Sequence, residues 1–203
     1  MGKMKKIITI KIGGSVLFTD RNKLDEFRMA HIVDQIISLR ERSIYSVLIV
    51  SGAVACGSHF INKQLAAGVG QIRLMSLLQR IFQNKQLEIA QILLTREQLN
   101  SDRVSFELKS LLDSCIESNV IPIFNENDVV ELNSFGGNDL LAAELSIAFK
   151  VDQLIIMSTM AGSKFGVGGG ETKIQAATLL QEKKIMSTIV NGKLKNVILD
   201  SIL

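Results

Sequence analysis

The sequence predicts an α/β protein, a three-layer α/β/α sandwich built around a mainly parallel sheet. Short runs rich in Ile, Val and Leu alternate with longer segments in which apolar residues recur at helical spacing. The short runs are continuously apolar, which is typical of strands that are buried on both faces. The length of 203 residues is enough for one domain with a full core and is short for two.

Six strands are expected, one in each continuous apolar run. They cover residues 7–12, 47–50, 89–94, 120–124, 154–157 and 185–190. Helices are expected between them, with apolar stripes that start at Leu24, Leu74, Leu108 and Leu141, and a further helix carries Ile174, Ala177 and Leu180. The alternation of strand and helix requires crossover connections, which give parallel strands with helices on both faces of the sheet. We therefore expect a single α/β domain over residues 1–203.

Composition and charge argue against several classes of function. Lys and Arg are scattered and the net charge is +3, so we expect no nucleic-acid partner. No apolar run approaches the length of a membrane span, and residues 7–12 are too few for a signal peptide, so we expect no membrane partner and a cytoplasmic location. Cys56 and Cys115 have neither CxxC spacing nor clustered His, which argues against a disulfide or a zinc site, and we assign no metal ligands.

Polar side chains gather in two loops that follow the apolar run 120–124. The first loop is Asn-Glu-Asn-Asp at 125–128, and the second is Gly-Gly-Asn-Asp at 136–139. Grouped carboxylates repel one another, so this set of acids and amides between apolar segments predicts a pocket for a positively charged occupant, either an ammonium group or a metal ion. Any one of these residues taken singly is better explained as an ordinary loop residue.

Glycine-containing loops follow other predicted strands. Gly-Gly-Ser at 13–15 and Ser-Gly-Ala at 51–53 end the first two strands. Glycine lets the backbone approach a ligand closely, so that N–H groups can point at phosphate oxygens. The glycine run within 166–170 opens a helix with Lys173 near its start, which adds a cation to the same arrangement. Each glycine loop alone is more simply a turn, and the Walker pattern GxxxxGK[ST] is absent.

Lys11 favours a phosphate site over a set of plain turns. A lysine inside an apolar strand, directly before Gly-Gly-Ser, is costly to bury without an anionic partner. Lys11, Lys173, the glycine loops and the polar pocket together predict phosphoryl transfer, in which a protein mainly positions groups and neutralises charge. The lysines would bridge the phosphates, Mg²⁺ would come with the nucleotide, and the polar pocket would hold the acceptor.

These segments resemble the amino acid kinase superfamily and, within it, the glutamate 5-kinases. The matching segments are 11–17, 51–57, 63–64 with 69–71, 90–95, 121–128, 135–139 and 168–177, in the order of the family. Asn-Glu-Asn-Asp is fairly specific to this branch, whereas the Lys-Ile-Gly-Gly-Ser start is shared across the superfamily. The resemblance implies ATP and Mg²⁺ as cofactors, L-glutamate as substrate, and a homo-oligomer, either a dimer or a tetramer. The apolar face of the helix over 71–84 is a candidate contact between subunits.

The resemblance also implies roles for single residues. Lys11 and Lys173 match the catalytic lysines that contact the transferring phosphoryl group. The glutamate would be held at Ser51, Gly52, Ala53, Asp128, Asn138 and Asp139. The nucleotide would be bound, besides the two lysines, by Gly13, Gly14, Ser15, Ser158, Thr159, Val167, Gly168, Gly169, Gly170, Glu171 and Thr172.

The chain departs from the family pattern at three places. Gly137 stands where the family has Asp, Ser158-Thr159 stands for Thr-Asp, and the segment between Met157 and Gly166 is shortened. We also expect no RNA-binding-like C-terminal domain. The sequence predicts ATP-dependent phosphorylation of the glutamate side chain to glutamyl 5-phosphate, the first step of proline biosynthesis. Two alternatives stay open: a weak or inactive relative that binds an amino acid or nucleotide, and a kinase of this fold for another small acceptor.

Overall fold

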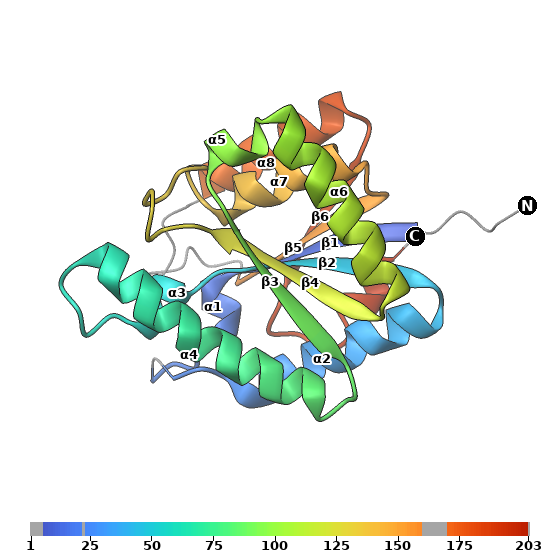
Figure 1. Ribbon diagram of the computed structural model, residues 1–203. Helices are drawn as coiled ribbons and strands as arrows, with labels where there is room; N and C mark the ends of the chain where they lie inside the picture. Colours follow the sequence, from blue (N-terminus) through green and yellow to red (C-terminus); the bar gives the residue numbers. More distant parts are fainter. Residues whose placement is uncertain (1–5, 22, 160–169, 203) are drawn as a thin grey trace, which may run out of the picture.

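The computed structural model describes residues 6–21, 23–159 and 170–202, and its centre is a six-stranded sheet (Figure 1). Every strand pairing in these ranges is parallel, and the strand order is β3-β4-β2-β1-β5-β6. The strands are β1 (Lys6–Ile12), β2 (Ile44–Val50), β3 (Glu88–Leu94), β4 (Val120–Glu126), β5 (Gln153–Ser158) and β6 (Met186–Asn191). All six predicted strands are confirmed, and the largest difference is at β2, which begins at Ile44 rather than at residue 47.

Helices cover both faces of the sheet, which confirms the three-layer arrangement (Figure 1). One face carries α1 (Gly14–Leu17), α2 (Glu26–Glu41), α3 (Ala53–Cys56), α4 (Lys63–Gln83) and the short 3₁₀ turn η1 (Leu199–Ser201). The other face carries α5 (Arg96–Leu99), α6 (Asp102–Glu117), α7 (Asn138–Phe149) and α8 (Gly170–Glu182). No helix in the part of the chain that the structure describes is long and apolar enough to cross a membrane.

The central strands separate two hydrophobic cores. In β1, Ile10 and Ile12 point into the core shared with α2 and α4. Lys11 lies on the opposite face, because successive side chains of a strand alternate, and this is the face that α7 covers. In β2, Leu48 joins the first core and Ile49 the second. This burial on both faces is what the continuous apolar runs predicted.

The long helix α4 packs one face into the first core. Leu74, Leu78 and Ile81 are buried there, so the apolar face of 71–84 that we considered for a subunit contact is used within the chain itself. A close crossing of α4 over α3 depends on glycine, since a Cβ atom at Gly70 would collide with the carbonyl oxygen of Ala53. This contact sets the position of the loop that follows β2.

The topology brings several loops to one edge of the sheet. The first strand, β1, lies in the centre, with β2 on one side and β5 on the other. In parallel sheets, ligands bind beyond the carboxyl ends of the strands, where the strand order changes direction. The segments that follow β1, β2, β4 and β5 therefore meet at this edge. Most of the shortened segment between Met157 and Gly166 falls within residues 160–169, which lie outside the described residues.

Candidate active site

A cavity of about 340 Å³ opens at the carboxyl ends of β1, β2, β4 and β5. Its walls bring together side chains from loops that are far apart in the sequence. They include the predicted acceptor residues Ser51, Gly52, Ala53, Asp128, Asn138 and Asp139, and the predicted phosphate and nucleotide residues Lys11, Gly13, Gly14, Ser15, Ser158 and Lys173. The two predicted sets of residues thus surround one space.

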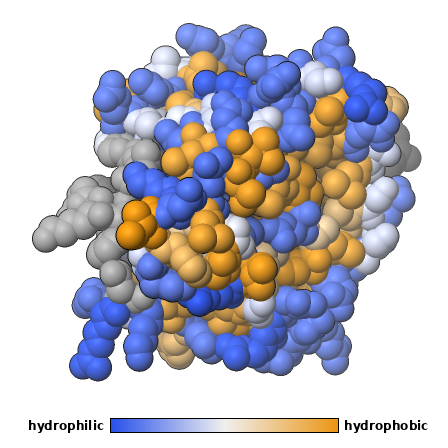
Figure 2. Space-filling view, turned by 60° about the vertical axis from the view of Figure 1, so that its left-hand side comes forward, coloured by the Kyte–Doolittle hydropathy of each residue, from blue (hydrophilic) through white to orange (hydrophobic). Residues whose placement is uncertain are grey.

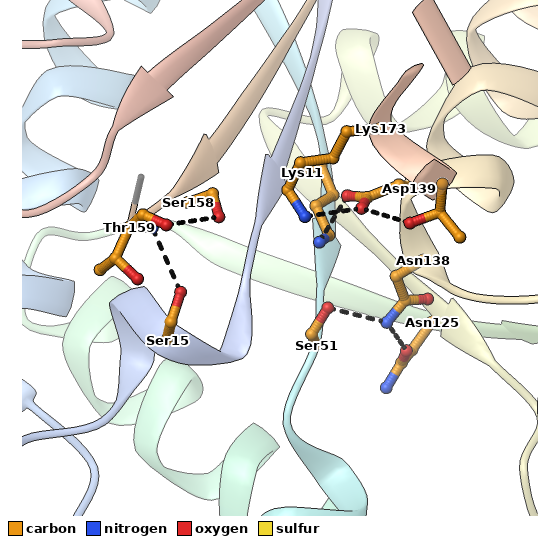
Figure 3. Close-up of polar contacts among 10 residues, drawn as sticks. Lys11, Ser15, Ser51, Asn125, Asn138, Asp139, Ser158, Thr159 and Lys173 are labelled. Atoms are coloured by element: carbon orange, nitrogen blue, oxygen red, sulfur yellow. Dashed lines mark hydrogen bonds and ion pairs between the residues drawn. The ribbon is translucent and has the colours of Figure 1, made fainter. Parts of the chain in front are cut away.

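The remaining predicted nucleotide residues lie outside the cavity wall or outside the described residues. The Thr159 N–H donates a hydrogen bond to Ser15 Oγ at 3.3 Å, which joins the ends of β5 and β1 (Figure 3). Gly170, Glu171 and Thr172 form the start of α8 and do not line the cavity. Val167, Gly168 and Gly169 fall in the part of the chain that the structure does not describe.

Two lysines converge on one aspartate at the floor of the cavity (Figure 3). Lys11 Nζ lies 2.6 Å from Asp139 Oδ1, and Lys173 Nζ lies 3.1 Å from Asp139 Oδ2. The Thr172 hydroxyl donates to the same Oδ2 at 3.2 Å. These groups come from β1, from the first turn of α7 and from the first turn of α8. The fold therefore assembles a cluster that adjacent residues of the sequence could not form.

Burial makes this charge cluster electrostatically strong. The side chains of Lys11, Asp139 and Lys173 are 8%, 4% and 18% exposed. Burial by itself raises the pKa of Asp139, but the two neighbouring ammonium groups outweigh burial and hold that pKa below its usual value. Burial lowers the pKa of Lys11, and Asp139 opposes this effect. Asp139 is thus an anion that keeps two cations close together and aimed into the cavity.

The glycines at the cavity have different structural roles. The Gly13 N–H donates to the Met157 carbonyl at 3.0 Å, so this N–H is used within the sheet and does not face a ligand. A Cβ atom at Gly13 would lie 2.8 Å from the same carbonyl oxygen, which explains the glycine by close strand approach. Gly52 has φ of 110° at the start of α3, a left-handed conformation that L side chains rarely adopt. Gly14 begins α1 and lines the cavity.

A chain of amide hydrogen bonds forms the other half of the cavity. Asn138 Nδ2 donates to Ser51 Oγ at 3.1 Å and to Asn125 Oδ1 at 2.8 Å (Figure 3). Asn125 Nδ2 in turn donates to Gln71 Oε1 of α4 at 2.9 Å. Asn138 Oδ1 is buried and has no hydrogen-bond partner among the described residues. It is therefore an acceptor that a ligand N–H group would satisfy.

Two carboxyl groups lie beside this amide chain. Asp128 accepts a hydrogen bond from the Asn133 N–H at 3.0 Å, and burial raises its pKa. Glu126, the last residue of β4, also lines the cavity, and burial raises its pKa to about 7. No individual role was assigned from the sequence to Glu126, Asn125 or Gln71. Asn125 and Glu126 belong to the polar loop at 125–128 that predicted the pocket, whereas nothing in the sequence pointed to Gln71.

Comparisons with known proteins agree with this fold. The model of a family described as the amino acid kinase family matches residues 6–162. A glutamate 5-kinase from Clostridium acetobutylicum is 32% identical over 92% of this chain and 86% of its own length. A second glutamate 5-kinase, from Clostridium tetani, is 31% identical over 96% of this chain and 90% of its own length. In a third relative, glutamate 5-kinase 2 from Pseudoalteromonas translucida, the match is 29% identical and spans 65% of the relative.

Solved structures share the fold at low sequence identity. The UMP kinase from Ureaplasma parvum has a TM-score of 0.66 and 15% identity, covering 97% of this chain and 94% of that chain. The carbamate kinase from Giardia lamblia has a TM-score of 0.63 and 12% identity, covering 98% of this chain and 96% of that chain. At this identity the likeness concerns the fold.

The fold, the two lysines around Asp139 and the family match together define the class. The chain belongs to the amino acid kinase family, and it is a phosphotransferase. Within that family, the curated relatives named above are glutamate 5-kinases.

Proposed function

We propose that this protein phosphorylates the side-chain carboxylate of L-glutamate with ATP, giving glutamyl 5-phosphate in the first step of proline biosynthesis. The observation that carries the proposal is the division of one cavity into two halves. One half holds the Lys11–Asp139–Lys173 cluster, and the other holds the chain of amides that ends at Asn138. The first half suits a transferring phosphoryl group and the second suits an amino acid. The names of the relatives support glutamate as that amino acid.

The reaction requires little from the protein beyond positioning the two substrates and stabilising the charge on the phosphoryl group. An oxygen of the acceptor carboxylate attacks the γ-phosphorus of ATP, the new P–O bond forms, and the bond to the β-phosphate oxygen breaks with its electrons going to ADP. A carboxylate is already ionised at neutral pH, so the reaction needs no general base. This agrees with the contacts of Asp139, whose oxygens are occupied by Lys11 and Lys173. The two ammonium groups would stabilise charge on the phosphoryl and leaving oxygens.

The amide half of the cavity matches the polar groups of a free amino acid. The ammonium group needs anionic and neutral acceptors, which Asp128 and the unpaired Asn138 Oδ1 offer. Carboxylate oxygens need donors, and the Ser51 hydroxyl lies between this half and the lysine cluster. We therefore place the acceptor with its ammonium group near Asp128 and its side-chain carboxylate near Ser51.

The nucleotide would bind with Mg²⁺ at the lysine half. Mg²⁺ is usually held by one or two carboxylates, water and substrate phosphates rather than by a dedicated protein cage. This fits the donors present, since no group of three or more His, Cys, Asp or Glu side chains suited to a metal occurs among the described residues. The ion would supply positive charge to the phosphates, beside that of Lys11 and Lys173, which line this half of the cavity.

The direct test is product formation with defined acceptors. Wild-type protein would be incubated with ATP and Mg²⁺ and either L-glutamate, L-aspartate or N-acetyl-L-glutamate, and acyl phosphate would be trapped as hydroxamate. We expect product with L-glutamate, and little with aspartate, which is shorter, or with the acetylated acceptor, which lacks the ammonium group. Calorimetric titration with each ligand separates the alternatives. A protein that binds glutamate but does not bind ATP would be a binding module. A protein that binds ATP but does not bind glutamate would act on another acceptor.

We further propose that the protein acts in the cytoplasm as a dimer or tetramer. Apolar side chains are exposed on α4 (Leu65 and Ile72), directly before it (Ile61) and on the neighbouring loop after β4 (Val129 and Val130). Figure 2, which brings the α3 and α4 side forward, shows apolar side chains gathered on this face. Light scattering of wild type and of Ile72→Glu tests this surface, and a monomeric wild type would contradict it.

A further inference from the structure

Glu126 connects the end of β4 to the loop that leads into α7. Its side chain lies at the cavity wall, and the residue is 6% exposed. Glu126 Oε2 accepts the backbone N–H of Phe135 at 3.1 Å, and the backbone N–H of Gly137 lies near enough to this carboxylate to lower its pKa. Backbone donors in an irregular buried loop need an acceptor from elsewhere, and here the carboxylate supplies it for Phe135. Glu126 therefore holds this loop by its backbone.

Arg96 of α5 holds the same loop from the other side. Its Nη2 donates to the Phe135 carbonyl oxygen at 2.8 Å and to Glu144 Oε1 of α7 at 2.7 Å. The Arg96 N–H also donates to Ser134 Oγ at 3.2 Å. Phe135 is thus bound at its N–H by Glu126 and at its carbonyl by Arg96, while its ring is fully buried in the second core.

The loop that is held in this way ends directly at the residues of the site. Gly137 has φ of 124° and ψ of 156°, a conformation open mainly to glycine, and Asn138 and Asp139 follow it as the first residues of α7. Asn138 contacts Ser51 and Asn125, and Asp139 contacts both lysines. A shift of the Phe135–Gly137 backbone would therefore move the acceptor amide and the anion between the lysines together.

We propose that the ionised carboxylate of Glu126 is a positioning group for the acceptor site, acting through the Phe135–Gly137 backbone, and that binding of an ammonium-bearing acceptor favours this ionised form. The inference rests on the proposed function for the identity of the acceptor. No hydrogen bond or ion pair among the described residues joins the Glu126 side chain to that of Asn138 or Asp139, so its effect passes through the loop.

The charge of Glu126 is sensitive to pH near neutrality. Burial has the largest effect on the pKa of Glu126 and raises it, and the charge of Asp128 raises it further. The backbone N–H groups of Phe135 and Gly137 and the charge of Arg96 lower it, and the resulting pKa is about 7. Lys11, Lys63, Asp139 and Lys173 are the other charged side chains that line the same cavity. As pH falls through about 7, Glu126 takes up a proton and offers weaker acceptors to the two N–H groups. An acceptor ammonium group at Asp128 would favour the ionised state.

The activity test compares three proteins over pH 5.5 to 8.5. Wild type, Glu126→Gln and the matched control Glu131→Gln, an exposed residue of the same loop, are assayed for kcat and for KM of L-glutamate. We expect the wild-type KM to rise below pH 7 by up to about tenfold per pH unit, the limit for one linked proton. Glu126→Gln should show a raised KM that changes little between pH 6 and 8, and Glu131→Gln should follow wild type. A Glu126→Gln protein with the wild-type KM and pH profile would overturn the proposal.

A second measurement needs no substrate. Hydrogen exchange at the Phe135 and Gly137 amides, corrected for intrinsic rates, is followed in ligand-free wild type and Glu126→Gln between pH 5.5 and 8.5. Protection in wild type should fall as pH falls below about 7, whereas protection in the variant should change little with pH. Equal protection in the two proteins overturns the inference even if glutamate is a substrate. If the exchange pattern is as expected but glutamate is not phosphorylated, the proposed function is rejected. The positioning role of Glu126 is then still supported.

Discussion

Replacement of Glu126 by Gln is expected to stabilise the protein at pH 8 and to change its stability little at pH 4. Burial raises the pKa of this carboxyl from its ordinary value of 4.5 to about 7. In the unfolded chain the group ionises near 4.5, so between these two values the folded protein binds the extra proton. The contribution of the group to stability is therefore fully present below pH 4.5 and is lost as pH rises through about 7. Gln cannot ionise and avoids this loss.

The size of the effect follows from the gap between the two pKa values. The gap is about 2.5, from 4.5 to about 7, which corresponds to about 3 kcal/mol of unfolding free energy at pH 8. The Gln amide oxygen can accept the hydrogen bond from Phe135 but is a weaker acceptor than a carboxylate, which costs about 1 kcal/mol. The expected net gain is about 2 kcal/mol at pH 8.

Urea unfolding followed by far-UV circular dichroism measures this directly. Wild type, Glu126→Gln and Glu131→Gln are compared at several pH values from 4 to 8, and the difference between proteins at each pH removes the titration of other carboxyl groups. If Glu126→Gln is destabilised by the same amount at pH 4 and at pH 8, hydrogen bonding rather than burial dominates at this site, and the argument above is wrong.

Four other substitutions test separate parts of the site. Lys11→Ala and Lys173→Ala should each lower kcat for glutamyl phosphate formation by about 100- to 1000-fold with an unchanged circular dichroism spectrum, and wild-type turnover in either would remove that lysine from the mechanism. Asp128→Asn should raise KM for glutamate with little change in kcat, because the ammonium contact is the same in ground and transition states; an unchanged KM contradicts the placement. Gly52→Ala should lower stability by about 1–3 kcal/mol, since φ is 110° and a Cβ atom would lie 3.1 Å from the Phe18 ring, and equal urea midpoints would show that the loop adapts.

The sheet was predictable because its central strands are buried on both faces and read as continuous apolar runs. The edge strands β3 and β6 are less buried, and their short runs rich in Ile, Leu and Val were enough to predict them. The short helices α1, α3 and α5 were not predicted, because four residues are too few for an apolar period to appear. The early start of β2 was also missed, since Tyr45 and Ser46 interrupt the apolar run.

The site was predictable as far as strand order determines it. Lys11, Ser51 and Asp128 follow or end parallel strands, so their approach to one edge follows from the topology. The pairing of Glu126 with Phe135 and Gly137, and of Arg96 with Phe135, depends on how two loops fold against each other, and no sequence spacing encodes it. Gly13 illustrates the reverse case. Its N–H was expected to face phosphate, but β5 lies alongside and takes it.

The central place of β1 has a consequence for how the chain folds. Its partner on one side, β5, pairs Gln153 with Ile8 and Met157 with Ile12, so this ladder forms between distant parts of the chain. Until β5 has been synthesised, β1 has an open edge of unpaired backbone groups, which favours pairing with other chains. Long-range pairing of this kind also slows folding. Because Lys173 lies on α8, which follows β5 in the chain, a nascent chain cannot complete the lysine cluster until α8 has been synthesised.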